Sequence, residues 1–257
     1  MIEEINKLPC VPGVYFFYDE KGNLIYIGKS INLRKRVLQH FCGKDRKSLK
    51  IQTFTKHIEF ETTGSELIAL LHESDLIKKH QPIYNRTQRK TIFQYGLYLN
   101  DFQGYKSLNI EKINPDKKEI TSFTTAKEAK ETLFRITEKY KLCQKINGLY
   151  KTSGSCFQYH IKECYGACIS NEFHQDYNKR VDLFLSKNVL KKITICIELP
   201  GRTEKEKGIV YIENGIYKGF GFCSFKEATE RTLIEVIDSK QDTKDARRIL
   251  MRYIINS

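Results

Sequence analysis

The stretch PGVYFFYDEKGNLIYIGKS, residues 12–30, decides the fold of the first part of the chain. Residues 14–18 and 24–28 are rich in β-branched and aromatic side chains, which favour strands. Residues 19–23 between them, Asp-Glu-Lys-Gly-Asn, are typical of a turn. The stretch therefore predicts a β-hairpin. Each of its strands carries a tyrosine, Tyr15 and Tyr26.

A helix is expected after the hairpin, over residues 31–41, with Ser30 as its N-cap. Apolar residues recur every four positions and predict its buried face: Leu33, Val37 and Phe41. One position earlier, polar residues recur at the same interval and predict a ridge beside that face: Asn32, Arg36 and His40. Arginine can donate paired hydrogen bonds to a phosphate, and histidine can orient a hydroxyl group or a water. A ridge of this kind beside two tyrosines fits a phosphodiester site, with an ordinary solvated basic face as the alternative.

The next expected elements are a strand over residues 57–62 and a helix over residues 65–80, which Pro82 ends. On this helix Glu73 borders the apolar stripe. A carboxylate in that position must be paired, capped or bound to a metal, and a hard oxygen ligand facing basic residues suits Mg²⁺. The alternative is an edge carboxylate that turns out to water.

The rest of the chain extends the α+β pattern, with a small antiparallel sheet flanked by helices in the first part and further strands and helices after it. Strands are expected to pair around residues 100–104, and around Asn214-Gly215, which is a strong turn signal. Residues 148–170, which hold three cysteines, show no regular pattern. The expected strands are residues 92–99, 105–113 and 193–199, and the expected helices are residues 126–140, 172–186, 225–238 and 243–254.

The composition limits the class of protein. Lys and Arg number 44 against 31 Asp and Glu, which gives a formal charge of +13 over 257 residues. Such a surplus favours a polyanionic partner such as nucleic acid, although a merely basic protein has the same composition. No apolar run approaches the ~18 residues of a membrane-spanning helix, and the acidic start lacks the pattern of a signal peptide. A cytoplasmic location is expected, where the eight cysteines are thiols or metal ligands rather than disulfides.

An ordered set of motifs in the first 85 residues resembles the GIY-YIG nucleases, and among them the type of the excision-repair nuclease UvrC and its shorter relative Cho. The motifs of the first half are PGVY at 12–15, YIGKS at 26–30, NLRKRV at 32–37 and HF at 40–41. Those of the second half are ELIALLHE at 66–73, IK at 77–78 and QPIYN at 81–85. Two positions depart from the usual pattern: Val14 replaces isoleucine, and His40 stands where UvrC often has tyrosine.

The resemblance implies a metal-dependent endonuclease and assigns its main roles. Glu73 would bind one divalent ion, Mg²⁺ or Mn²⁺, and Arg36 would contact the scissile phosphate. Tyr15 and Tyr26 would flank the attacking water, one of them as general base. A free tyrosine has a pKa of about 10 and is a poor base at neutral pH, so nearby cations must assist the proton transfer.

The resemblance also assigns three supporting residues. Lys29 and His40 would tune the tyrosine that acts as base, and Asn85 would close the site and support its geometry. The residues implied in catalysis are therefore Tyr15, Tyr26, Lys29, Arg36, His40, Glu73 and Asn85.

Four cysteines lie close together in the sequence: Cys143, Cys156, Cys164 and Cys168. Four such thiolates can bind an iron–sulfur cluster or Zn²⁺. Their spacing is not that of a paired CxxC zinc site, which favours iron–sulfur, with zinc and plain thiols as alternatives. The flanking sequence resembles the cysteine region that follows the nuclease domain of UvrC, and this resemblance implies a [4Fe–4S] cluster. The remaining cysteines are expected to be small core residues: Cys10, Cys42, Cys196 and Cys223.

Two basic segments are expected to flank the nuclease site and to bind DNA phosphates, with ordinary solvated loops as the alternative. The first segment contributes Lys44, Arg46, Lys47 and Lys50, and the second contributes Arg86, Arg89 and Lys90.

Three regions are expected: a GIY-YIG nuclease domain at 1–90, a UvrC-like cysteine-rich middle region at 91–187, and a small α+β C-terminal module of unknown role at 188–257. As a whole the chain resembles the GIY-YIG half of bacterial exonuclease–GIY-YIG fusion proteins, and it is either a stand-alone protein or a fragment of one. The resemblance implies DNA nicking in nucleotide-excision-type repair, with an exonuclease domain or other repair proteins as partners.

Three alternatives to this function stay open. The first is a non-catalytic DNA-binding module with a structural metal cluster in a larger repair or proofreading complex. The second is a mobile-element or restriction nuclease, which the cysteine region disfavours. The third is RNA as the substrate.

Overall fold

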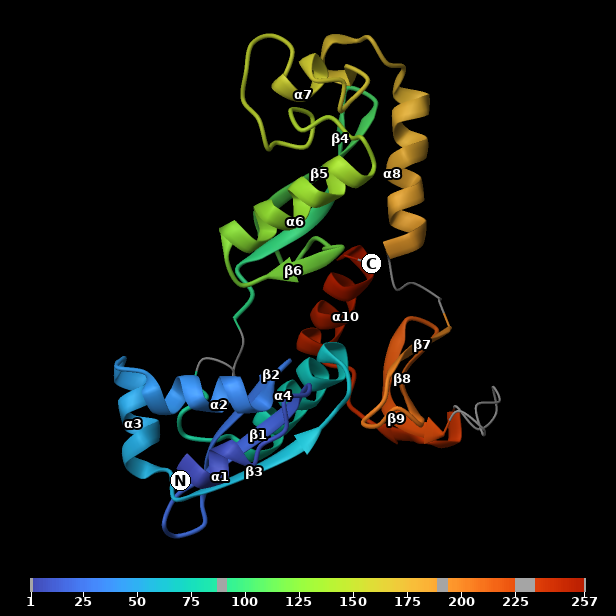
Figure 1. The fold of residues 1–257 in the computed structure, drawn as a ribbon. Helices are drawn as coiled ribbons and strands as arrows, with labels where there is room; N and C mark the ends of the chain where they lie inside the picture. Colours follow the sequence, from blue (N-terminus) through green and yellow to red (C-terminus); the bar gives the residue numbers. More distant parts are fainter. Residues whose placement is uncertain (1, 87–91, 189–193, 225–233, 257) are drawn as a thin grey trace. The chain divides into compact units, whose positions relative to one another are not determined.

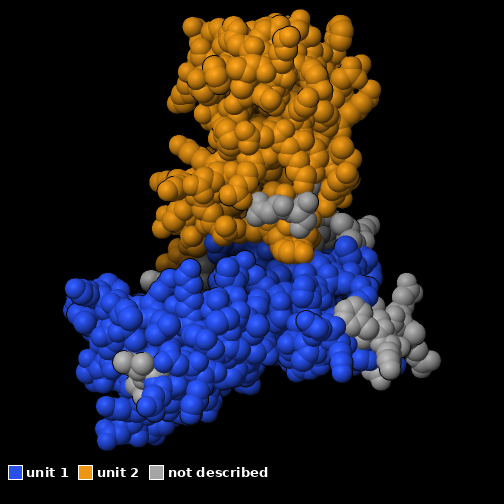
Figure 2. Space-filling view, viewed as in Figure 1, with its two compact units in different colours: residues 1–91, 190–250 blue, residues 92–189, 251–257 orange. Residues whose placement is uncertain are grey.

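The structure is a computed structural model, and it describes residues 2–86, 92–188, 194–224 and 234–256. The chain divides into two compact units (Figure 2). The first unit comprises Met1–Thr91 and Leu190–Leu250, and the second comprises Ile92–Val189 and Met251–Ser257. The first unit contains small antiparallel sheets and helices, and the second contains a small antiparallel sheet and helices (Figure 1), so the α+β class predicted from the sequence is confirmed. Among the described residues, no helix is both long and apolar enough to cross a membrane.

The first unit begins with a short helix, α1 (Ile2–Asn6), and a three-stranded antiparallel sheet in the order β2-β1-β3. β1 (Gly13–Tyr18) lies between β2 (Leu24–Ser30) and β3 (His57–Thr62) (Figure 1). The hairpin and the third strand predicted from the sequence are both confirmed. β1 is buried on both faces, and it contributes Tyr15 and Phe17 to one core cluster and Val14 and Phe16 to another.

The helix after the hairpin, α2 (Leu33–Cys42), begins later than the sequence predicts. Its N-cap is Asn32, whose side-chain oxygen accepts a hydrogen bond from the Lys35 amide at 2.9 Å. Ser30 is therefore not the cap: its hydroxyl oxygen accepts from the Asn32 amide at 2.9 Å, outside the helix. An asparagine oxygen reaches the third amide of a helix directly, and this fixes the start of α2 at Leu33.

A third helix, α3 (Arg46–Phe54), is not among the elements predicted from the sequence. Its N-cap is Asp45, whose side chain accepts hydrogen bonds from the amides of Lys47 and Ser48. The basic residues expected on a loop therefore lie mostly on a helix. The helix predicted at residues 65–80 is confirmed as α4 (Glu66–His80), which Ser65 caps and a left-handed Gln81 ends.

The C-terminal part of the first unit is a four-stranded sheet in the order β10-β9-β8-β7. Its strands are β7 (Ile195–Pro200), β8 (Glu206–Glu213), β9 (Ile216–Ser224) and β10 (Ile237–Ser239). The helix α10 (Lys244–Asn256) follows, and the first unit includes it up to Leu250. The predicted turn at Asn214-Gly215 is confirmed, and both residues have positive φ. Most of the helix predicted at 225–238 lies outside the described residues, and its end is wrong because Ile237 and Asp238 pair with β9 as a strand.

This C-terminal sheet packs against α4. The ring of Phe220 lies edge-on to that of His72, with 5.3 Å between ring centroids. The Lys240 ammonium forms an ion pair with Asp75 at 3.3 Å. The helix that carries Glu73 is therefore in contact with strands that lie more than a hundred residues later in the chain.

The second unit contains a three-stranded sheet in the order β5-β4-β6. β4 (Tyr95–Phe102) and β5 (Tyr105–Lys112) form a tight hairpin in which Phe102 pairs with Tyr105. The turn is therefore Gln103-Gly104, shorter than the predicted turn at 100–104, and β4 extends to Phe102 for that reason. The remaining elements are β6 (Thr121–Phe123), α6 (Ala126–Lys139), α7 (Phe157–His160), the 3₁₀ turn η1 (Ala167–Ile169) and α8 (His174–Asn188).

Candidate active site

The pairing of β1 with β2 places Tyr15 opposite Gly28. The tyrosine side chain occupies the space above this glycine, because a Cβ at Gly28 would lie 2.3 Å from the Tyr15 hydroxyl oxygen. No side chain larger than hydrogen fits at that separation. The glycine of the YIG motif therefore creates the room in which Tyr15 lies.

Tyr15, Tyr26 and His40 form a buried polar group inside an otherwise apolar cluster. The Tyr15 hydroxyl and His40 Nε2 are 2.8 Å apart and share a hydrogen bond. The ring centroids of Tyr15 and Tyr26 lie 6.0 Å apart, and those of Tyr26 and His40 lie 5.3 Å apart. The polar ridge predicted on α2 thus places His40, only 8% exposed, beside both strand tyrosines.

Burial is the main influence on the protonation of these groups. It raises the pKa of Tyr15 well above its usual value, and it raises the pKa of Tyr26 to about 12. It lowers the pKa of His40 to about 4, an effect that the nearby Arg36 and Lys47 charges reinforce. At neutral pH the imidazole is therefore neutral, and it can both donate and accept a hydrogen bond.

Glu73 reaches this group from α4. One of its carboxylate oxygens accepts a hydrogen bond from the Lys29 amide of β2 at 3.1 Å. After burial, the Glu73 charge is the next largest cause of the raised pKa of Tyr26. A half-buried carboxylate beside phenolic oxygens is a set of hard oxygen donors, and such donors suit Mg²⁺ or Mn²⁺. The residues present therefore fit a divalent cation bound at Glu73.

Positive charge also lies close to the tyrosines. The Lys47 ammonium lies over the ring of Tyr26, 4.3 Å from its centroid. Arg36 is exposed, and its Nη1 donates to Gln39 Oε1 at 3.0 Å. The Arg36 charge opposes the effect of burial on the pKa of both Tyr15 and Tyr26, so the guanidinium lies within electrostatic reach of both hydroxyl groups.

Two residues of the predicted site have other contacts than expected. The Lys29 ammonium forms an ion pair with Glu66, so it is the Lys29 backbone amide that contacts Glu73. Asn32 uses its side chain to cap α2 and so fixes where that helix begins. The ridge predicted from the spacing therefore separates into a cap, an exposed arginine and a buried histidine.

Asn85 lies next to the edge of β2 and is 1% exposed. Its Oδ1 accepts a hydrogen bond from the Ile27 amide at 2.9 Å, and its Nδ2 donates to the Ile27 carbonyl at 2.7 Å. The side chain thus satisfies both backbone groups of Ile27, as a neighbouring strand would.

The predicted phosphate-binding residues have the exposure that this role requires. Lys44, Arg46, Lys47, Lys50 and Arg86 are exposed, while Arg89 and Lys90 lie outside the described residues. Sequence patterns missed that Lys47 lies over Tyr26, because no helix was expected at residues 46–54. The available signal was Asp45, a common N-cap residue, followed by Ile51 and Phe54, which are three residues apart as on one face of a helix.

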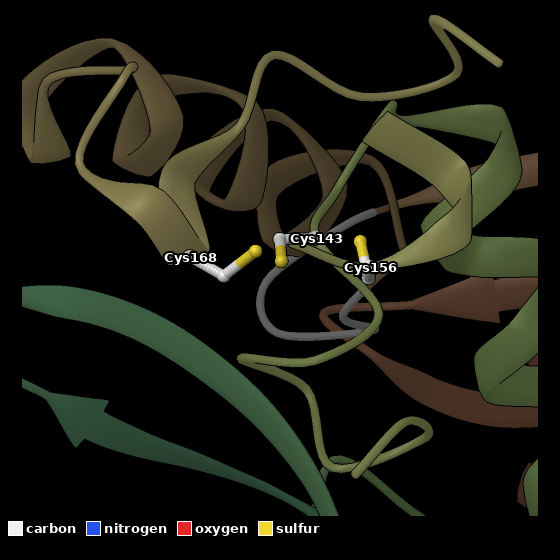
Figure 3. A group of neighbouring side chains, drawn as sticks. All are labelled: Cys143, Cys156 and Cys168. Carbon is white, nitrogen blue, oxygen red and sulfur yellow. The ribbon is translucent and has the colours of Figure 1, made fainter. Parts of the chain in front are cut away.

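The second unit brings the cysteines of the middle region together (Figure 3). The Sγ atoms of Cys143, Cys156 and Cys168 all lie within 4.8 Å of one another. Cys164 joins this group, because it shares a side-chain hydrogen bond with Cys143 that lowers its own pKa. Burial raises the pKa of Cys156 and Cys168, which keeps these thiols protonated unless a cation binds.

The other four cysteines only partly fit the predicted core role. Cys223 is buried and Cys196 is half-buried, but Cys10 and Cys42 are exposed. The prediction is wrong for Cys10 and Cys42. Cys10 lies in the loop before β1, and Cys42 ends α2 one residue beyond the apolar stripe.

Comparisons with known proteins identify two parts of the chain. The model of the UvrC-like GIY-YIG domain matches residues 11–86, and that of the middle domain of the UvrC/Cho excinuclease matches residues 95–187. The solved GIY-YIG N-terminal endonuclease domain of UvrC from Thermotoga maritima, bound to magnesium, is 34% identical over 32% of this chain and 92% of that chain, with a TM-score of 0.31.

Two curated relatives show how far the similarity extends. Excinuclease cho of Escherichia coli (strain K12) is 34% identical over 69% of this chain and 61% of its own length. UvrABC system protein C of Lachnospira eligens is 30% identical over 92% of this chain and 40% of its own length. The chain thus spans less than two thirds of either relative. Through residues 11–86 and 95–187, the chain belongs to the UvrC/Cho type of GIY-YIG proteins.

Proposed function

We propose that the chain is a divalent-metal-dependent endonuclease that hydrolyses phosphodiester bonds of DNA in nucleotide-excision-type repair. The observation that carries this proposal is the group formed by Tyr15, Tyr26 and His40, on which the charges of Glu73 and Arg36 both act. A DNA-binding module would not require a carboxylate, a guanidinium group and two neighbouring tyrosines around one point. The names of the UvrC and Cho relatives support the same conclusion.

In this proposal Tyr26 accepts the proton of the attacking water after its own proton has left to solvent, a loss that a divalent cation at Glu73 would favour by lowering the raised pKa of Tyr26. The interaction with the Tyr15 hydroxyl lowers the pKa of Tyr26. His40 shares a hydrogen bond with the Tyr15 hydroxyl at 2.8 Å and so holds Tyr15 beside Tyr26.

The remaining groups bind and orient the substrate. The exposed Arg36 guanidinium is suited to a bidentate contact with the scissile phosphate. A divalent cation at Glu73, when bound, stabilises negative charge on the leaving oxygen and lowers the pKa of the groups around it. The exposed lysines and arginines on and before α3, together with Arg86, position the DNA backbone.

The test replaces Glu73 by glutamine, which keeps the shape of the side chain and removes its charge. Nicking should be measured on intact, mismatched, flapped and damaged duplexes, with and without Mg²⁺. We expect Glu73→Gln to lose Mg²⁺-dependent nicking while DNA binding persists, and Glu59→Gln, an exposed carboxylate on β3, to behave as wild type. Unchanged nicking by Glu73→Gln would refute the assignment. A wild-type chain that binds all these duplexes and nicks none would instead be a DNA-binding module.

We further propose that the four cysteines of the second unit bind a [4Fe–4S] cluster, with Zn²⁺ as the alternative. The close approach of Cys143, Cys156 and Cys168, and the contact of Cys164 with Cys143, support a site with four sulfur ligands. Its role would be structural, because it would join three segments that have little regular structure. An exonuclease domain or other repair proteins as partners, and a cytoplasmic location, stay predictions.

A further inference from the structure

One face of α3 is turned toward the strand that carries Tyr26. Lys47, Ile51 and Phe54 lie on this face, since residues three, four and seven apart share a side of a helix. Ile51 is fully buried in the cluster that contains Tyr15 and Tyr26, and Lys47 lies over Tyr26. The face therefore runs from the candidate active site to the end of the helix, where Phe54 lies.

Phe54 pairs with Tyr84 at that end. The two ring centroids are 6.3 Å apart and the planes are tilted by 35°. Tyr84 is fixed beside β2, because its amide donates to the Ile25 carbonyl at 3.0 Å. Phe54 is nevertheless 50% exposed, so part of its ring is open to solvent while Tyr84 supports it.

The position of this pair relative to the site is fixed by the helix. Seven residues separate Phe54 from Lys47, which corresponds to about 10 Å along a helix axis. Gln52 ties α3 to α2, because its Nε2 donates to the His40 carbonyl at 3.0 Å and to the Gly43 carbonyl at 2.7 Å. The aromatic pair is thus attached to the same helix that carries Arg36 and His40.

The surroundings of Phe54 are positively charged. Residues 46–58 contain four cations and no carboxylate in the sequence: Arg46, Lys47, Lys50 and Lys56. All four are exposed. An exposed aromatic ring on a segment with an excess of exposed cations matches the chemistry of a nucleic-acid strand, in which phosphates meet the cations and a base stacks on the ring. An apolar protein partner would leave these charges without counterparts.

We propose that Phe54, supported by Tyr84, is a stacking platform for an unpaired base of the strand being cut, a few nucleotides from the scissile phosphate. In an intact duplex the bases stack on each other and cannot reach the ring, so the platform favours DNA with unstacked or displaced bases. This inference rests on the proposed nuclease function and extends it by assigning the substrate class and the residue that selects it.

The test uses the full chain with Glu73→Gln, so that binding is measured without cleavage. The probe is a duplex with an unpaired 2-aminopurine, whose fluorescence falls when it stacks on an aromatic ring. We expect Phe54→Ala to remove the quenching and to weaken binding of this duplex by about tenfold, which is in the range of one base–aromatic stack. Binding of the intact duplex should change less than twofold.

Three further variants separate stacking from folding. Phe54→Leu retains apolar contact with Tyr84 but offers no ring, and we expect it to behave as Phe54→Ala. Phe54→Tyr should restore quenching. Leu49→Ala removes a side chain that is 51% exposed on the other side of α3, and it should leave both duplexes unaffected.

Equal losses on intact and unpaired duplexes, or quenching that survives in Phe54→Leu, would overturn the proposal. Metal-dependent nicking by the otherwise unmodified chain is measured separately. If nicking is present and the quenching result is negative, only the stacking platform fails. If the otherwise unmodified chain does not nick DNA, it is the proposed nuclease function that fails.

Discussion

The carboxamide of Asn85 forms two hydrogen bonds with the backbone of Ile27, a residue 58 positions earlier in the chain. Ile27 lies between Tyr26 and Gly28, so this contact fixes the segment of β2 on which the candidate site depends. Asn85→Ala would leave a buried amide and a buried carbonyl without partners. We expect it to lower the free energy of unfolding by on the order of 3 kcal/mol, and to reduce the nicking rate.

Thermal unfolding and nicking assays check this expectation. Asn23→Ala is the matched control, because Asn23 lies in the turn of the same hairpin but is exposed, and its side-chain Nδ2 donates to Asp19 Oδ2. Its effect should stay within about 0.5 kcal/mol. Equal stability of the Asn85→Ala and Asn23→Ala variants would contradict a structural role for the carboxamide.

Gly28→Ala tests the close approach of Tyr15 to β2. The added methyl group would lie 2.3 Å from the Tyr15 hydroxyl oxygen, so the ring must shift and its hydrogen bond with His40 must lengthen. We expect a loss of about 1–3 kcal/mol in stability, typical of overpacking, and a larger loss in nicking. Gly154→Ala, where a Cβ would meet no atom within 4 Å, should change neither. Wild-type nicking by Gly28→Ala would show that the position of Tyr15 is not critical.

The elements that follow from local patterns were predictable, and α4 is the clearest example. Its cap, Ser65, and its apolar stripe lie within one stretch of sequence, so Glu66–His80 agrees with the prediction to one residue. α3 was not predicted because the sequence around Asp45 is dominated by lysines and arginines. The stability of this short helix depends on burying Ile51 against distant residues. β10 was missed for a similar reason, since three residues become a strand only through pairing with β9.

In the candidate site, too, local motifs predicted single residues but not the contacts between elements that are distant in the sequence. The motifs and their resemblance to the GIY-YIG pattern named Tyr15, Arg36, His40 and Glu73 as candidates, because each has a fixed place on its own strand or helix. The ion pair of Lys29 with Glu66 depends on how two elements meet. The pairing of Phe54 with Tyr84 also joins segments that are thirty residues apart, and no local pattern predicts it.

The depressed pKa of His40 has a consequence for stability at acid pH. Burial lowers this pKa to about 4, whereas the unfolded chain has the ordinary histidine value of about 6.5. Between these values the unfolded state binds a proton that the folded state does not, so stability falls as the pH drops from about 6.5 toward 4. The contribution of His40 to this loss is on the order of 3 kcal/mol when complete.

An NMR titration of the six histidines checks this prediction directly. The His40→Gln variant identifies the resonance and should also flatten the acid side of the thermal unfolding profile. Titration of His40 at or above pH 6.5 would contradict both its burial and its assignment as a neutral partner of Tyr15.

The cysteine group of the second unit predicts a coloured protein. A chain purified without oxygen should be brown, with broad visible absorption and about four iron atoms per chain, if four thiolates bind one cluster. Cys143→Ser and Cys168→Ser should each lose the colour and lower the unfolding temperature, because the segments that the cluster joins have little regular structure to hold them. Cys42→Ser, at an exposed position in the first unit, should retain both. A colourless wild-type preparation with one zinc per chain would replace the iron–sulfur assignment by a zinc site. A Cys143→Ser variant with the metal content of the wild type would refute a metal site at these cysteines.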